Sequence, residues 1–148
     1  MSYINQIKTI QKSFASLPAT TQSAIFTVTG RILLHQIVGE VTTIIENQAC
    51  NLKITANPTV GADVDLCANL DVDNDAVGTI YTITGDFSDA LVETTSGAVE
   101  TTPTAYSRFP ILIAAGTIDL VTSATNTGSV KWTVQYTALD AGSTVTAA

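Results

Sequence analysis

The chain has 148 residues and a mass of 15.4 kDa, the size of one domain. Thr, Ile and Val make up 52 of these residues and 45% of the chain is apolar, so we expect a folded, mainly β protein, because β-branched side chains suit a pleated sheet. The net charge of −7, with only six Lys and Arg, excludes nucleic acid as a main partner, since a phosphate backbone is bound through basic residues.

The N-terminal segment, 1–17, differs in pattern from everything that follows. Its apolar side chains recur at spacings of four, three, four and three, which predicts one short amphipathic helix that Ser2 caps and Pro18 ends. A helix of about four turns is marginally stable by itself, so its apolar stripe must be buried. The stripe packs either on its own β domain or on a partner, and the sequence leaves both possibilities open.

The same stripe favours self-association. Ile7 and Ile10 occupy adjacent seam positions, a choice that favours three strands in parallel coiled coils, so we predict a homo-oligomer and specifically a trimer. Lys8 and Lys12 are one helical turn apart and would meet carboxylates of an acidic partner. The predicted partner and oligomer contacts are Tyr3, Ile7, Lys8, Ile10, Lys12, Phe14 and Leu17.

Residues 18–23 form a predicted linker, and residues 24–148 form the predicted β domain. About ten short antiparallel strands without a further helix predict an all-β fold, a β-sandwich or a jelly-roll-like arrangement. The clearest strand is 129–138, where Val130, Trp132 and Val134 alternate with polar residues, and Gly39 predicts a bulge or bend. The expected strands are 25–29, 31–38, 40–46, 50–56, 63–69, 78–84, 89–93, 109–114, 117–123 and 129–138.

One acidic run, Asp71–Asp75, begins like a calcium-binding loop. The pattern fails at its sixth position, which is Ala76 where the loop needs glycine, and at its twelfth, which is Thr82 where it needs glutamate. We therefore expect an acidic loop that holds no metal, and no other cofactor is indicated. A looser cation site that also uses Asp63 or Asp65 remains an alternative.

The candidates for catalysis are few. The single histidine, His35, has no sequence partner that suggests a catalytic triad, so we predict no catalytic residue and no enzymatic activity. Cys50 alternates with apolar residues and Cys67 with polar ones, which favours two free thiols over a disulfide without excluding the pair.

Charge and hydropathy also bear on location. The longest apolar-rich run, Ile32–Ile45, is broken by polar residues, so no membrane span is expected. The N-terminus lacks the order of a signal peptide, although a Thr-rich and Lys-poor composition is typical of extracellular surfaces. A virion protein, made in the host cytoplasm and released by lysis, reconciles the two observations. Residues 1–60 carry a net charge of +2 and residues 61–148 carry −9, so the N-terminal part is the one that would face an acidic partner.

Several strand and turn segments between residues 24 and 142 together resemble small structural proteins of tailed bacteriophages. They are Phe26–Gly30, Gly39–Thr43, Leu52–Thr59, Leu66–Ala68, Gly78–Gly85, Gly116–Ile118 and Asn126–Trp132. The resemblance implies a β-rich virion component and, by analogy with other accessory head proteins, a capsid decoration or cement protein that stabilises the shell. Its implied partners are the major capsid protein or other virion proteins, and no site residue is carried over from the family.

Two other functions stay open at this stage. The first is a tail, neck or fibre-base component of the virion. The second is a carbohydrate-binding β-sandwich module, which the fold would permit. That module would need an exposed aromatic ring, whereas the alternation around Trp132 predicts that this ring faces inward.

Overall fold

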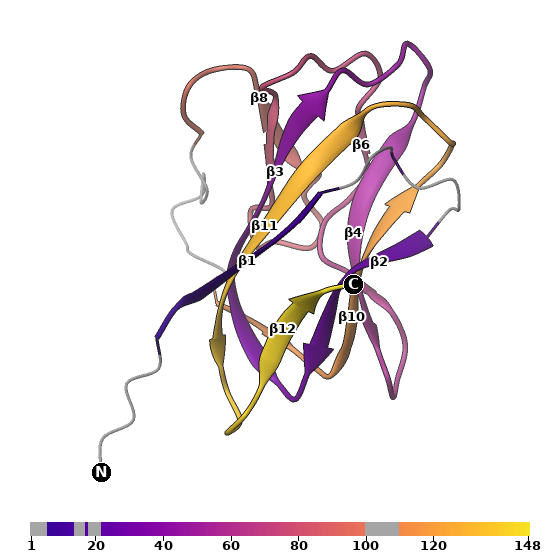
Figure 1. The fold of residues 1–148 in the computed structure, drawn as a ribbon. Coiled ribbons are helices and arrows are strands. Elements are labelled where there is room, and N and C mark those ends of the chain that lie inside the picture. Colours follow the sequence, from indigo (N-terminus) through magenta and orange to yellow (C-terminus); the bar gives the residue numbers. More distant parts are fainter. Residues whose placement is uncertain (1–5, 14–16, 18–21, 100–109) are drawn as a thin grey trace.

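The computed structural model describes residues 6–13, 17, 22–99 and 110–148. These residues form twelve β-strands in two antiparallel sheets of six strands each, which face one another as a β-sandwich (Figure 1). This confirms the all-β sandwich. It contradicts the predicted N-terminal helix, because the described residues contain no helix and residues 8–13 form a strand.

Sheet 1 is built around its two longest strands. Its order is β1-β11-β3-β7-β8. The short β9 also pairs with β3, at the first residues of that strand, whereas β7 pairs with its later residues. All these pairings are antiparallel. The bounds are β1 Lys8–Ser13, β3 Ile32–Thr43, β7 Ile80–Thr82, β8 Val92–Thr94, β9 Ile111–Ile113 and β11 Ser129–Ala138.

Sheet 2 packs against it with the order β12-β2-β10-β4-β5, and β6 also pairs with β4. β1 of sheet 1 contacts β12 of sheet 2, so the two sheets approach each other along one side of the sandwich. β8 and β5 end the two sheets on the other side. The bounds are β2 Gln22–Thr29, β4 Asn51–Pro58, β5 Val64–Asp65, β6 Leu70–Asp71, β10 Gly116–Thr122 and β12 Thr144–Ala147.

The core lies between the sheets and centres on β11. The alternation predicted for this strand is confirmed, because Val130, Trp132, Val134 and Tyr136 are all buried. The Trp132 ring stacks on Tyr81 of β7, with ring centroids 6.2 Å apart and an angle of 25° between the planes. This aromatic pair adds to the burial of apolar area that holds sheet 1 against sheet 2.

The N-terminal segment is a strand because β11 offers it a partner. Ile10 lies opposite Val134 and packs against the core, with Lys8 opposite Tyr136. A short helix would be marginal by itself, whereas β-branched residues such as Thr9 and Ile10 fit a sheet well. The sheet contact therefore outweighs the helical spacing. Gln22 and Ser23, which belong to the predicted linker, already lie in β2.

The predicted strands 31–38 and 40–46 are one continuous strand, β3, and the predicted bulge at Gly39 is wrong. Gly39 lies in regular register opposite Trp132, and the register shifts occur instead near His35 and Thr42, which the pairing with β11 skips. A Cβ atom added at Gly39 would lie 2.7 Å from a carbon of the Trp132 ring. The glycine is therefore a place where a large ring packs directly on the backbone.

The two cysteines are free and buried. Cys67 does not sit on a polar face as expected, because Leu66 and Cys67 are both buried and the alternation breaks there. Burial raises the pKa of the Cys67 thiol to about 11, and it also raises the pKa of Cys50.

Candidate functional site

Six of the seven predicted contact residues fall into three groups in the structure, and the seventh, Lys12, is described below. Lys8, the first residue of β1, and Ile7, which directly precedes the strand, are exposed, with 61% of Ile7 accessible. Ile10 is half-buried and Leu17 is fully buried in the core. Tyr3 and Phe14 lie outside the described residues. The structure therefore brings Ile7 and Lys8 together at the surface, and it places Leu17 in the interior of its own domain.

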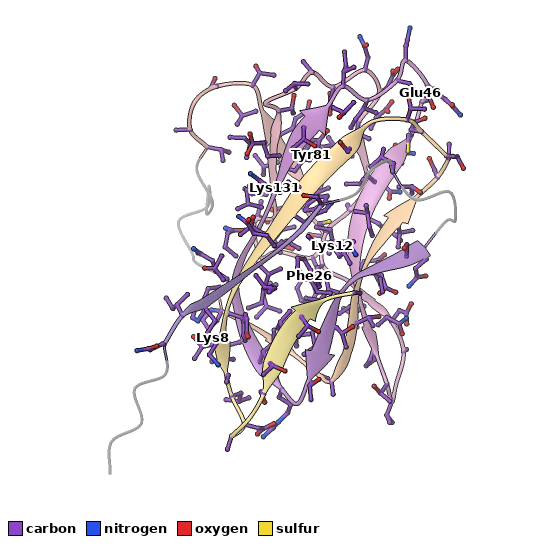
Figure 2. The ribbon with its side chains drawn as sticks, in the orientation of Figure 1. Lys8, Lys12, Phe26, Glu46, Tyr81 and Lys131 are labelled. Carbon is purple, nitrogen blue, oxygen red and sulfur yellow. The ribbon has the colours of Figure 1, made fainter. Side chains whose placement is uncertain are left out.

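The two lysines of β1 lie on one face of the strand, because side chains at alternate positions of a strand point the same way (Figure 2). Lys12 lies opposite Trp132, and its Nζ donates a hydrogen bond to the main-chain oxygen of Ala148, just beyond β12. This bond joins the edge of sheet 1 to the edge of sheet 2.

Three other cations of the described residues form ion pairs with carboxylates. Arg31 pairs with Asp140 at 2.6 Å, Lys53 with Asp65 at 2.7 Å and Lys131 with Glu40 at 3.6 Å. Lys8 forms no ion pair with any residue that the structure describes. Its charge is therefore available to a partner.

A groove opens on the opposite side of the sandwich, where β9 of sheet 1 comes near β4 and β5 of sheet 2. Its volume is about 220 Å³, and its lining is mostly apolar. Three large side chains in the lining are unusually exposed: Leu112 at 56%, Val64 at 45% and Phe87 at 42%. The remaining lining residues are Ala56, Asn57, Pro58, Ala62, Leu66, Ile113 and Ala114.

The groove lies in the most acidic part of the chain. Between Lys53 and Arg108 the sequence contains nine Asp and Glu and no Lys or Arg. Two of these acids, Asp63 and Asp86, are the direct chain neighbours of the lining residues Val64 and Phe87. Asp63 accepts a hydrogen bond from Gln22 at 3.0 Å, and Asp86 accepts hydrogen bonds from Ser88. The segments that line the apolar groove therefore carry acidic neighbours, whereas Lys8 makes the exposed start of β1 basic.

A pair of carboxyl groups lies beside β7 and β8. The Tyr81 hydroxyl donates a hydrogen bond to Asp75, and Glu93 of β8, which lies opposite Tyr81, is near enough to Asp75 for the two charges to interact. Partial burial raises the pKa of both Asp75 and Glu93, and the charge of Asp75 raises the pKa of Glu93 further. Burial, together with the bond to Asp75, also raises the pKa of Tyr81.

Sequence reasoning missed this pair. Asp75 and Glu93 are 18 residues apart in the sequence. The pairing of β7 with β8 places Glu93 opposite Tyr81, and the Tyr81 hydroxyl is hydrogen-bonded to Asp75. The one sequence signal was that Tyr81 and Glu93 fall in the two expected strands 78–84 and 89–93.

The acidic run Asp71–Asp75 contains a turn in which Asp71 and Asp75 accept hydrogen bonds from the chain, while Asp73 Oδ1 is buried without a hydrogen-bond partner among the described residues. Asp71 Oδ1 accepts hydrogen bonds from the main-chain nitrogens of Cys50 and Asp73, at 3.3 and 3.1 Å. Asn74 has a φ of 60°, so this residue supplies the reversal for which a calcium loop uses glycine. Within the described ranges, no three His, Cys, Asp or Glu side chains converge as metal ligands would.

His35 and Trp132 both lie within sheet 1. His35 is in β3, with its Nε2 2.5 Å from Thr137 Oγ1 on the neighbouring strand. Trp132 is fully buried under Gly39, so its ring is not available to stack on a sugar.

Among the residues that the structure describes, no helix is long and apolar enough to cross a membrane.

The sequence matches none of the protein-family models and none of the curated proteins compared with it. Among solved structures, the chain is similar to a chain in the structure of the infectious bursal disease virus Gx strain, with 14% identity and a TM-score of 0.28. The comparison covers 97% of this chain and 39% of the viral one, so this chain spans about two fifths of the length of that protein.

Proposed function

We propose that the chain is a structural protein of a virus particle, and specifically a capsid decoration or cement protein of a tailed bacteriophage. The observation that carries this proposal is the arrangement of its surface. The exposed apolar side chains Ile7, Leu112 and Phe87 lie at the two sides of the β-sandwich, where neighbouring subunits would meet them. A large exposed apolar side chain on a soluble protein is typical of a contact surface when it belongs to a patch.

The segments that resemble phage structural proteins support the same function, because they build the body of the sandwich. Phe26–Gly30 lies in β2 and its turn, Leu52–Thr59 covers β4, and Asn126–Trp132 leads into β11. The net charge of −7 suits a protein that is crowded on a shell, since like charges keep neighbouring copies soluble.

The proposed partners are further copies of this chain and the major capsid protein or another virion protein. Among the predicted contact residues that the structure describes, Ile7 and Lys8 are the exposed ones. The coiled-coil reasoning that favoured three copies fails together with the helix, so we propose self-association without assigning a number of copies.

Mass spectrometry and cryo-electron microscopy of purified particles test this function. We expect the protein in many copies on the head surface. Stripping it with a mild chaotrope should lower the temperature at which the head releases its DNA, and adding back the purified protein should restore that temperature. A few copies at one vertex or along the tail would favour the neck or tail alternative, and absence from the particles would contradict the virion function altogether.

A further inference from the structure

The two sides of the sandwich complement each other in shape and charge. One side presents Ile7, an exposed apolar side chain, directly before the exposed Lys8. The other side has an apolar groove with acidic chain neighbours. β1 and β12 form the first side and β5 and β9 contribute to the second, so one copy of the chain cannot bring its own Ile7 to its own groove.

We propose that Ile7 of one copy inserts into the groove of a second copy, between Phe87, Val64 and Leu112. The inference rests on the proposed function for its setting, because a shell surface places copies side by side. The contact is head-to-tail: the two copies use different surfaces, and the same contact can be repeated by every copy.

The dimensions fit this occupant. An apolar cavity of about 150 Å³ holds a benzene molecule, so a groove of about 220 Å³ has room for the four-carbon side chain of isoleucine. Burying Ile7 would also cover Leu112, and more than half of each side chain is now exposed. Both surfaces would then leave water, which is the main favourable contribution to such a contact.

The charges favour a second copy as the occupant. Lys8 follows Ile7 directly, is exposed, and forms no ion pair within the described part of its own chain. In the head-to-tail arrangement it approaches the side that carries Asp63 and Asp86.

A head-to-tail contact closes into a ring where its rotation permits and otherwise continues as an open array. One side chain in one groove is a small interface, so the isolated protein should associate weakly. On a particle, the high local concentration of copies would favour the same contact.

Sedimentation velocity of the full chain, at concentrations up to the millimolar range and at low salt, tests the contact. We expect a concentration-dependent increase in mass. Ile7→Ser and Leu112→Ser should each raise the dissociation constant at least about tenfold, because each removes one half of the buried apolar contact. The matched controls are Ile44→Ser and Leu139→Ser, which change residues that are 53% and 42% accessible but line no part of the groove. Circular dichroism checks that all four variants are folded.

Mixing the two defective variants separates head-to-tail from symmetric association. Ile7→Ser keeps an intact groove and Leu112→Ser keeps an intact Ile7, so their mixture should form a one-to-one dimer that grows no further. A symmetric contact would not be restored by mixing, and that result would overturn the proposal. A Leu112→Ser protein that melts at a lower temperature but associates as the wild type does would also overturn the proposal. Leu112 would then be covered by its own chain and not by a second copy.

The particle experiment remains independent of this one. A wild-type chain that stays monomeric at every concentration overturns the head-to-tail contact and leaves the virion function standing. Head-to-tail association of a protein that is absent from particles would support the contact and contradict the proposed function.

Discussion

Substituting Gly39 by alanine should destabilise the protein, because β3 and the Trp132 ring leave no room for a methyl group. The added Cβ would lie 2.7, 2.9 and 3.0 Å from three carbons of that ring, whereas carbon atoms in favourable contact are about 3.5–4.0 Å apart. The ring is fully buried against Tyr81, so it cannot move away freely. Overpacking of this kind costs about 1–3 kcal/mol, a large part of the roughly 5–15 kcal/mol that stabilises a typical domain.

Urea denaturation followed by circular dichroism measures this loss of free energy. The matched control is Gly97→Ala, because no described atom lies within 4 Å of a Cβ added at Gly97. Gly39→Ala should lower the stability less in a Trp132→Leu protein than in the wild type, because the smaller side chain leaves room for the methyl group. A double-mutant cycle measures this difference. Equal stability of Gly39→Ala and Gly97→Ala, within about 0.5 kcal/mol, would refute the packing argument.

Three further outcomes are expected. The raised pKa values of Asp75 and Glu93 mean that their protonated forms favour the folded state. Their contribution to stability is therefore complete below the ordinary carboxyl pKa of about 4.3, and it is lost as the pH rises through the raised values. Glu93→Gln should flatten the fall in melting temperature between mildly acidic and neutral pH, and an unchanged profile would contradict this. Cys50 and Cys67 should not react with a thiol reagent near neutral pH until the protein is unfolded in urea, because both are buried and have raised pKa values; rapid labelling of the native protein would show that one of them is accessible. Adding calcium or a chelator should leave the melting temperature unchanged, because Asp71 Oδ1 is already bonded to the main chain; a calcium-dependent rise of several degrees would reveal a cation site.

Strands whose residues alternate were predictable from the sequence. In β11 the apolar face was named residue by residue, and Val130, Trp132 and Val134 are all buried as expected. Short strands such as β6 and β12 were not predictable, because alternation becomes visible only over a longer run of residues.

The N-terminal segment shows a limit of pattern analysis. The spacing of Ile7 and Ile10 fits a helix, yet Lys8, Ile10 and Lys12 also share one face of a strand. Pairing with β11, which lies near the other end of the chain, stabilises the strand through backbone hydrogen bonds and apolar contact. Sequence reasoning over a short window cannot include such a partner.

The groove could not be predicted for a related reason. Val64, Phe87 and Leu112 come from three segments that are far apart in the sequence, and none of these segments has a motif of its own. What the sequence did contain was the long stretch without a cation after Lys53, and this stretch became the acidic side of the sandwich.

The order of strands within sheet 1 also has a consequence for biosynthesis. β11 lies between β1 and β3, so β1 has no partner in the sheet until β11 has left the ribosome. At translation rates of about 5–20 residues per second, the growing chain must wait on the order of ten seconds with β1 unpaired. Strand pairs so distant in the chain also close slowly after release. A nascent chain of this kind is most vulnerable to aggregation just before β11 emerges, and it is there that a chaperone would protect it.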